Sequence, residues 1–176
     1  MKINLEEFEE HFKGRKVLIT GHSGFKGKWL CRILKSLNSR VYGISSYLLN
    51  LSEFGFSKKS DLIDVEFISD ISNDEVKPII SKIKPDYIFH FAAQALVKKS
   101  FEDPLNTFKV NTLGTCVILD ALRNFEKECK VVLITSDKVY ENKEWIWGYR
   151  EIDHLGGKDP YSASKAMAEI AIHSYL

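Results

Sequence analysis

The sequence lacks the features that mark several specialised classes of protein. Among 176 residues it has three cysteines, Cys31, Cys116 and Cys129, which are widely spaced and form no CxxC pair. Neither a disulfide framework nor a cysteine-rich metal site is therefore indicated. The five histidines are scattered without ligand spacing, so we expect no metal. No apolar run approaches the ~18 residues of a membrane span, and the acidic start of the chain is unlike a secretory signal.

An excess of charge of either sign is also missing. Lysine plus arginine number 25 and aspartate plus glutamate 24, which leaves no electrostatic footprint for nucleic acid or an anionic membrane. Apolar residues make up 44% and charged residues 28%, an ordinary globular mixture without repeats or low-complexity stretches. Because cysteines outside a disulfide pattern suit a reducing compartment, we expect a cytoplasmic protein.

Short apolar runs alternate with longer amphipathic ones. They predict buried strands at Lys16–Thr20, Arg40–Ser45, Val65–Ser69, Tyr87–Phe91 and Lys130–Thr135. They predict helices at Gly24–Leu37, Ser72–Lys84, Leu105–Phe125 and from Pro160 to the end, with Ser72 as N-cap and Glu75 completing a capping box. Strands joined by helices imply a parallel sheet covered on both faces. We therefore expect one α/β domain over residues 1–176, with a doubly wound, Rossmann-like sheet.

Ligands of such sheets bind beyond the carboxyl ends of the strands. The first of these ends carries a GxxGxxG pattern that follows a strand and opens a helix. Its residues are Gly21, His22, Ser23, Gly24, Phe25, Lys26 and Gly27. Glycines let the backbone approach a pyrophosphate, and a helix N-terminus favours the anion. The pattern indicates dinucleotide binding; the alternative is a tight turn without a ligand.

A second motif lies near the end of the chain. Tyr161 and Lys165 are four residues apart, so a phenol and an ammonium share one helical face. A nearby cation stabilises a phenolate and lowers the tyrosine pKa, which would make Tyr161 a base during hydride transfer. The alternative is an ordinary pair on a helix surface.

Together these motifs resemble the extended short-chain dehydrogenases/reductases, and among them the nucleotide-sugar 4,6-dehydratases that act on CDP-glucose. The resemblance covers nearly the whole chain. The matching segments are Thr20–Gly27, Phe91–Gln94, Ser100–Pro104, Asn111–Thr115, Thr135–Tyr140, Trp147–Glu151 and Asp159–Lys165. The most specific are the Ser-Asp-Lys triplet at 136–138 and the Trp-Gly-Tyr-Arg-Glu run at 147–151.

The resemblance implies an NAD-dependent mechanism in which hydride leaves the sugar C4 and returns at C6. Tyr161 would take the C4 hydroxyl proton with Lys165 beside it, and Ser136 would hold the C4 oxygen. Lys138 would remove the C5 proton and Asp137 would protonate the departing C6 hydroxyl. For Asp137 and Lys138 the alternative is a solvated ion pair.

The resemblance also implies a set of cofactor contacts. They are Gly21, His22, Ser23, Gly24, Phe25, Lys26, Gly27, Asp70, Ile71, Phe91, Ala92, Ala93, Gln94, Asn111, Thr135, Tyr161 and Lys165. Asp70 fits an acid that contacts adenine, or else a cap of the following helix. Asn111 fits a helix asparagine near the active site, or else an ordinary buried polar residue.

Two departures from the family pattern stand out. NAD enzymes of this fold often place an acid after the second strand, where this chain has no carboxylate until Glu53, although Lys58 and Lys59 follow. The choice between NAD and NADP therefore stays open. The chain also has about half the length of the family, so we expect the C-terminal substrate domain to be missing and these residues alone to be inactive.

The resemblance further implies CDP-glucose as the substrate and a homodimer built on the two long helices, Leu105–Phe125 and Pro160–Leu176. Two alternatives stay open. One is another nucleotide-sugar dehydratase or epimerase, and the other is a dinucleotide-binding module without catalysis.

Overall fold

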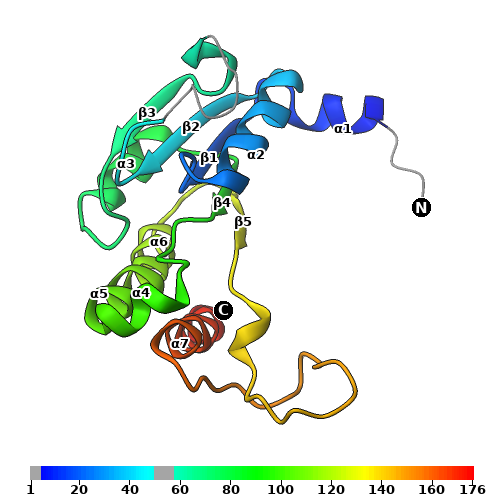
Figure 1. Ribbon diagram of the computed structural model, residues 1–176. Helices are drawn as coiled ribbons and strands as arrows, with labels where there is room; N and C mark the ends of the chain where they lie inside the picture. Colours follow the sequence, from blue (N-terminus) through cyan, green and yellow to red (C-terminus); the bar gives the residue numbers. More distant parts are fainter. Residues whose placement is uncertain (1–4, 50–57) are drawn as a thin grey trace.

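A parallel sheet organises the chain. The structure is a computed structural model that describes residues 5–49 and 58–176. Its strands are β1 (Lys16–Thr20), β2 (Arg40–Ser45), β3 (Val65–Ile68), β4 (Tyr87–His90) and β5 (Lys130–Leu133), in the order β3-β2-β1-β4-β5 (Figure 1). Every pair is parallel. The doubly wound, Rossmann-like prediction is confirmed, and the strand ranges agree to within two residues.

The two faces of the sheet bury different side chains, because neighbouring residues of a strand point to opposite sides. Val17 and Ile19 of β1 pack on one face with Cys31 and Leu34. The residues on that face include Phe12 of α1 (Leu5–Phe12) and several from α2 (Phe25–Ser36). On the other face Leu18 packs with side chains from α3 (Val76–Ile83) and α6 (Gly114–Leu122). Continuous apolar strands are what a sheet covered on both sides requires.

The remaining elements follow the sheet strands or connect the helices. They are the 3-10 turns η2 (Lys59–Asp61) and η4 (Asp137–Val139), the π-helical turn η3 (Lys109–Leu113), and the helices α4 (Val97–Glu102), α5 (Pro104–Phe108) and α7 (Pro160–Tyr175). In the described part of the chain, no helix combines the length and apolarity that crossing a membrane takes.

The predicted capping box at the third helix is wrong. Helix α3 begins at Val76, and its N-cap is Glu75, which makes no capping hydrogen bond with its side chain. Asp70 competes successfully for Ser72: its Oδ1 accepts the Ser72 N–H at 2.9 Å and the Ser72 hydroxyl at 2.6 Å. A turn therefore replaces the first helical turn, because an Asx-type hydrogen bond offers the backbone an alternative to the helix.

The predicted helix Leu105–Phe125 is broken into three parts, α5, the wider turn η3 and α6. The wider turn presents two consecutive polar residues to α7. Asn111 Nδ2 donates to Ser164 Oγ at 2.9 Å, and Thr112 Oγ1 donates to the Ser164 carbonyl at 2.9 Å. Single π-helical turns recur at functional sites, and here one joins two helices through buried polar contacts.

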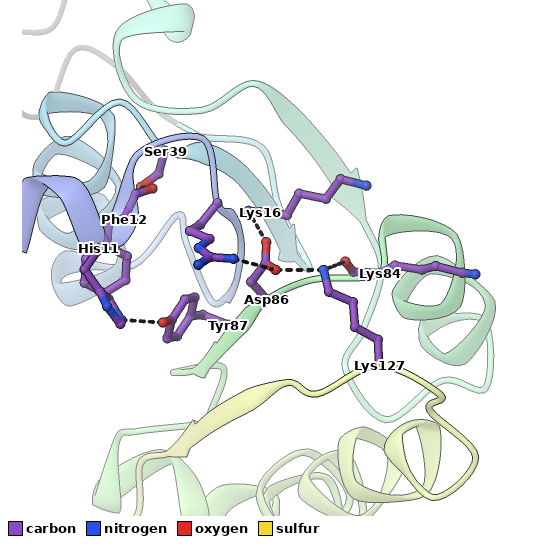
Figure 2. Close-up of polar contacts among 9 residues, drawn as sticks. His11, Phe12, Lys16, Ser39, Lys84, Asp86, Tyr87 and Lys127 are labelled. Atoms are coloured by element: carbon purple, nitrogen blue, oxygen red, sulfur yellow. Dashed lines mark hydrogen bonds and ion pairs between the residues drawn. The ribbon is translucent and has the colours of Figure 1, made fainter.

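Two helices, α1 and α4, were not predicted. Helix α1 lies at the amino ends of the strands, where Tyr87 and His11 share a hydrogen bond and Ser39 Oγ donates to the Phe12 carbonyl at 3.0 Å (Figure 2). Beside them Asp86 accepts the Lys16 N–H at 2.8 Å and pairs with Lys127 at 2.7 Å. The carboxylate of Asp86 thus links β1 and β4 to the chain before β5.

Candidate dinucleotide and catalytic site

The glycine loop after β1 is compact because two of its positions leave no room for a side chain. Gly21 has φ +70°, a conformation that favours glycine, and a Cβ there would lie 2.7 Å from the Ala92 nitrogen. A Cβ on Gly27 would lie 2.3 Å from the Gly21 carbonyl oxygen. The loop therefore needs glycine at both ends, and α2 begins directly against it. The backbone surface that this leaves is the kind of cradle that a pyrophosphate occupies.

A cavity of about 450 Å³ opens beside this loop, at the carboxyl ends of the strands. It lies where the chain leaves β1 on one side and β4 on the other, the place where doubly wound sheets bind ligands. Of the predicted cofactor residues, it is lined by Gly21, Gly24, Phe25, Lys26, Gly27, Asp70, Ile71, Phe91, Ala92, Ala93, Thr135, Tyr161 and Lys165. The two motifs of the sequence thus meet at one cavity.

Other predicted residues lie behind the wall of the cavity rather than in it. His22 and Ser23 are buried under the loop, and the Ser23 hydroxyl shares a hydrogen bond with that of Ser45. Asn111 is fully buried; its Oδ1 accepts the Gln94 N–H at 2.8 Å, and its Nδ2 donates to the Gln94 carbonyl at 3.1 Å. These contacts give Asn111 and Gln94 a structural role, and their contact with a cofactor stays a prediction.

The end of the cavity near β2 and β3 is hydroxyl-rich. Ser45 and Ser46 line it together with Tyr47, while Asp70 is the acid in its wall. Asp70 lines the cavity and holds the Ser72 turn, but it does not cap α3, and its contact with adenine stays a prediction. The described residues directly after β2, 46–49, include no acid, and Glu53 lies outside the described residues.

The other end of the cavity is formed by α7. This helix begins with Pro160 after the N-cap Asp159, whose side chain accepts the Ser162 N–H at 2.9 Å. Tyr161 and Lys165 both reach the cavity from its first turns, which confirms that they share a helical face. The Lys165 ammonium is buried and donates to the Ile134 carbonyl at 3.0 Å.

The surroundings of Lys165 set its charge. Burial lowers the pKa of Lys165 to about 8, while Glu169 acts to raise it and Lys26 to lower it. At neutral pH the ammonium is therefore still mostly protonated, and the cavity contains a cation beside Tyr161. The Thr135 hydroxyl donates to the Glu169 carboxylate. Glu169 was missed by the sequence analysis, although its position four residues after Lys165 puts it on the same helical face.

The Ser-Asp-Lys triplet lies apart from the cavity lining. The Ser136 hydroxyl accepts the Lys138 N–H at 3.2 Å and donates to Asp137 Oδ1 at 3.1 Å, within the turn η4. Asp137 and Lys138 are exposed. The roles that the resemblance implies for the triplet therefore stay predictions.

The lining also includes Tyr47, Ala95, Val110 and Ile134, which the sequence analysis did not select. They follow strand ends or lie on η3, and no local pattern distinguishes them.

Within residues 5–49 and 58–176, no group of three or more histidine, cysteine, aspartate or glutamate side chains has a geometry that could hold a metal.

Comparison with known families shows which family the chain belongs to. The family described as GDP-mannose 4,6 dehydratase matches residues 18–176. The chain belongs to this family. It therefore groups with nucleotide-sugar dehydratases and epimerases, as the resemblance implied.

Individual relatives agree. The chain is 40% identical over 169 residues to a CDP-glucose 4,6-dehydratase of Salmonella typhimurium, a match that covers 93% of this chain and 46% of the relative. It is 31% identical to a CDP-paratose 2-epimerase of Salmonella typhi, covering 88% and 51%. The chain spans about half the length of the curated relatives it matches.

Solved structures show the same fold. A UDP-glucose 4-epimerase of Thermus thermophilus, in complex with NAD, matches with a TM-score of 0.74 and 30% identity, over 91% of this chain and 50% of that one. Pal from Bacillus thuringiensis matches with a TM-score of 0.79 and 26% identity, over 91% and 51%.

Proposed function

We propose that the chain binds NAD⁺ and carries the oxidation centre of a nucleotide-sugar 4,6-dehydratase whose substrate is CDP-glucose. The observation that carries this proposal is that the glycine loop and the pair Tyr161 and Lys165 line one cavity. The cradle formed at Gly21 and Gly27, which any Cβ would fill, fits a dinucleotide pyrophosphate. The similarity to a CDP-glucose 4,6-dehydratase supports the choice of sugar nucleotide.

The glycine loop and the cavity would hold NAD⁺, which would supply hydride-transfer chemistry between the sugar C4 and C6. Tyr161 takes the C4 hydroxyl proton at its phenolic oxygen, and the Lys165 cation stabilises the negative charge left there. Lys165 keeps its position through the Ile134 carbonyl. Glycine-loop N–H groups and the start of α2 favour the negative charge of the pyrophosphate.

The elimination step falls to the triplet. Ser136 holds the C4 oxygen, Lys138 takes the C5 proton, and Asp137 gives a proton to the C6 hydroxyl as it leaves as water. Lys138 gives the proton back to C5 when C6 is reduced. Because η4 follows β5, the triplet lies at the carboxyl end of the sheet, where the cavity also opens. Their exposure means that a bound sugar would have to bring them out of water to make them effective.

The first test is binding of NAD⁺ by the purified 176-residue chain, measured by calorimetry. The second is formation of a 4-keto sugar from CDP-glucose, followed by alkaline absorbance, with the protein at the length its organism makes. UDP-glucose and dTDP-glucose serve as competing substrates. Absence of NAD⁺ binding would contradict the proposal, and faster turnover of another nucleotide sugar would contradict the choice of CDP-glucose.

Replacement of Tyr161 by Phe tests the base. We expect Tyr161→Phe to leave NAD⁺ affinity nearly unchanged and to reduce turnover at least ~100-fold, the range of general acid-base effects. Turnover close to that of the unchanged protein would show that another group accepts the C4 proton.

Replacement of Lys138 by Ala tests the elimination step. We expect Lys138→Ala to allow oxidation at C4 and to stop exchange of the C5 proton, because the base is removed. Deuterium incorporation at C5 from D₂O, followed by NMR, is the measurement. Undiminished incorporation would assign the C5 base elsewhere.

An epimerase is the second candidate. The observation that favours it is the position of Asp137 and Lys138 outside the cavity lining, since an epimerase needs the oxidation centre without the elimination groups. The C5 exchange experiment separates the two, because only elimination across C5 and C6 requires loss of the C5 proton.

We further infer that the chain pairs with a second copy through α5, η3 and α7. Leu105 is 81% exposed and Leu113 56%, and on α7 Met167 is 47% and Ile170 59% exposed. Apolar side chains gathered on adjacent helices are typical of an association surface.

A further inference from the structure

A buried carboxylate lies behind the cavity and takes no part in lining it. Glu66 is in the middle of β3, and 3% of its side chain is exposed. His22 Nε2 lies 2.8 Å from its Oε1, and the same oxygen accepts the Leu49 N–H at 2.8 Å. The Lys59 ammonium pairs with the other carboxylate oxygen. One side chain thus joins three other segments of the chain.

Two of these segments, those of His22 and Leu49, form or adjoin the wall of the cavity near β2 and β3, and so does the chain after β3. His22 is the second residue of the glycine loop, between Gly21 and Gly24, which both line the cavity. Leu49 comes two residues after Tyr47, which lines it as well. Glu66 itself lies in the strand that leads to Asp70. The carboxylate therefore lies where it can fix the spacing of the loop, the segment after β2 and the end of β3.

The His22 ring is held in one position by the sheet beneath it. The side chain is fully buried, and a Cβ on Gly43 of β2 would lie 2.5 Å from its Cγ and Nδ1. Its Nδ1 is buried without a hydrogen-bond partner in the structure described. The ring therefore rests against a glycine, and Nε2 is its polar contact, the one to Glu66. Loss of that contact would leave both nitrogens of the ring without a partner.

The Glu66 carboxylate is ionised in this setting. Burial raises the pKa of Glu66, but the hydrogen bonds that its two oxygens accept lower the pKa by more, and it lies below its usual value. Hydrogen bonds to an ionised acceptor are about twice as strong as neutral ones. Removal of the charge while the side chain keeps its size should therefore loosen all three contacts together.

We propose that Glu66 is a positioning residue for the adenosine half of the dinucleotide: through His22 and the Leu49 N–H it holds the phosphate loop at a fixed distance from the wall after β2. The usual acid of this fold follows β2 and contacts the ribose itself. Glu66 acts instead from behind the wall, with its oxygens occupied by protein groups. This inference rests on the proposed binding of NAD⁺.

The test compares two carboxylates of the same region. Glu66→Gln removes the charge and keeps the volume. Asp64→Asn is the matched control, because Asp64 also accepts a backbone N–H, that of Val41 at 2.7 Å, and pairs with a lysine, Lys35 at 2.7 Å, without touching the loop. We expect both variants to lower the melting temperature. Only Glu66→Gln should weaken NAD⁺ binding, by at least tenfold, whereas Asp64→Asn should change it less than twofold.

Binding of ADP shows which half of the dinucleotide the Glu66→Gln substitution affects. ADP carries the adenosine and pyrophosphate and lacks the nicotinamide, so Glu66→Gln should weaken ADP and NAD⁺ by the same factor. His22→Phe is the second variant, since it keeps a ring over Gly43 and loses the contact to Glu66. Because the two residues act as a unit, the double variant should bind NAD⁺ no more weakly than the worse single variant.

The outcomes of these measurements separate the proposed function from the inference about Glu66. If the unchanged chain fails to bind NAD⁺, the proposed function falls. If it binds NAD⁺, and folded Glu66→Gln or His22→Phe binds with an unchanged dissociation constant, the inference falls while the proposed function stands. A weakening confined to NAD⁺, with ADP unaffected, would also overturn it, because the effect would then lie at the nicotinamide.

Discussion

At the scale of single residues, His90 shows how burial fixes the charge of a group at the carboxyl end of β4. Its ring lies 2.7 Å from Thr20 Oγ1 and 3.2 Å from Thr115 Oγ1, and only 2% of the residue is exposed. Burial, with a smaller effect of the Lys165 cation, lowers the pKa of His90 to about 3. The imidazole is therefore neutral at the end of β4, where two hydroxyls from other elements meet it.

This neutral histidine predicts loss of stability in acid. The unfolded chain takes up the His90 proton near pH 6.5 and the folded chain only near pH 3, so between these values the unfolded state binds more protons. The free energy of unfolding should fall on acidification by up to about 1.4 kcal/mol per pH unit from this one group. Urea denaturation of the unchanged chain and of His90→Gln between pH 7 and pH 4 measures it. Equal pH slopes would show that His90 does not contribute.

At the scale of elements, the wide turn η3 links the loop after β4 to α7. Asn111 makes three hydrogen bonds there, two with Gln94 and one with Ser164 of α7. Asn111 is fully buried, and its side-chain amide pairs with the Gln94 N–H, the Gln94 carbonyl and the Ser164 hydroxyl. The orientation of α7, and with it the position of Tyr161 and Lys165, thus depends on an asparagine that lies outside the cavity.

We expect Asn111→Ala to destabilise the chain by about 2–4 kcal/mol, because it leaves buried partners without a hydrogen bond. It should also weaken NAD⁺ binding, since α7 loses a contact that orients it. Thermal unfolding and calorimetry are the measurements. Asn124→Ala, at an exposed position after α6, is the control and should change neither quantity. An Asn111→Ala protein as stable as the control would contradict the role of η3.

The elements that could be predicted from sequence are those with a local pattern. The strands of a sheet covered on both faces are continuous apolar runs, and the glycine loop and the Tyr161–Lys165 spacing each fit within a few residues. The parts that were missed depend on distant partners. Glu66 contacts His22 across 44 positions, and a lone glutamate in a strand carries no sign of this. The start of α3 was misplaced because Asp70 holds Ser72 in a turn, so that the helix begins only at Val76.

At the scale of the whole molecule, association through α5, η3 and α7 is a prediction with a clear readout. On the two predicted helices, Leu105, Leu113, Met167 and Ile170 are exposed, whereas Val117 and Leu122 pack against the core. We expect light scattering to show dimers at high micromolar concentration. Ile170→Glu should weaken the dimer at least ~10-fold, because a charge would be buried on pairing.

Ile152→Glu is the control, since Ile152 is 84% exposed in the loop between β5 and α7. It should leave the dimer intact. A monomer at all concentrations, or equal effects of the two variants, would place any association elsewhere.

The strand β5 pairs with β4 on one side, and in the described residues no strand pairs with its other side. The N–H groups of Lys130 and Ile134 donate to the backbone carbonyls of Asp86 and His90, on the β4 side. Because successive N–H groups of a strand point in opposite directions, those of Val131 and Leu133 point to the open side. Hydrogen–deuterium exchange should therefore divide this strand residue by residue, with Val131 and Leu133 exchanging quickly and Val132 slowly. The same open row is a template on which a further extended segment can form hydrogen bonds, so the purified chain should bind strand-forming peptides and aggregate more readily when no such segment is present.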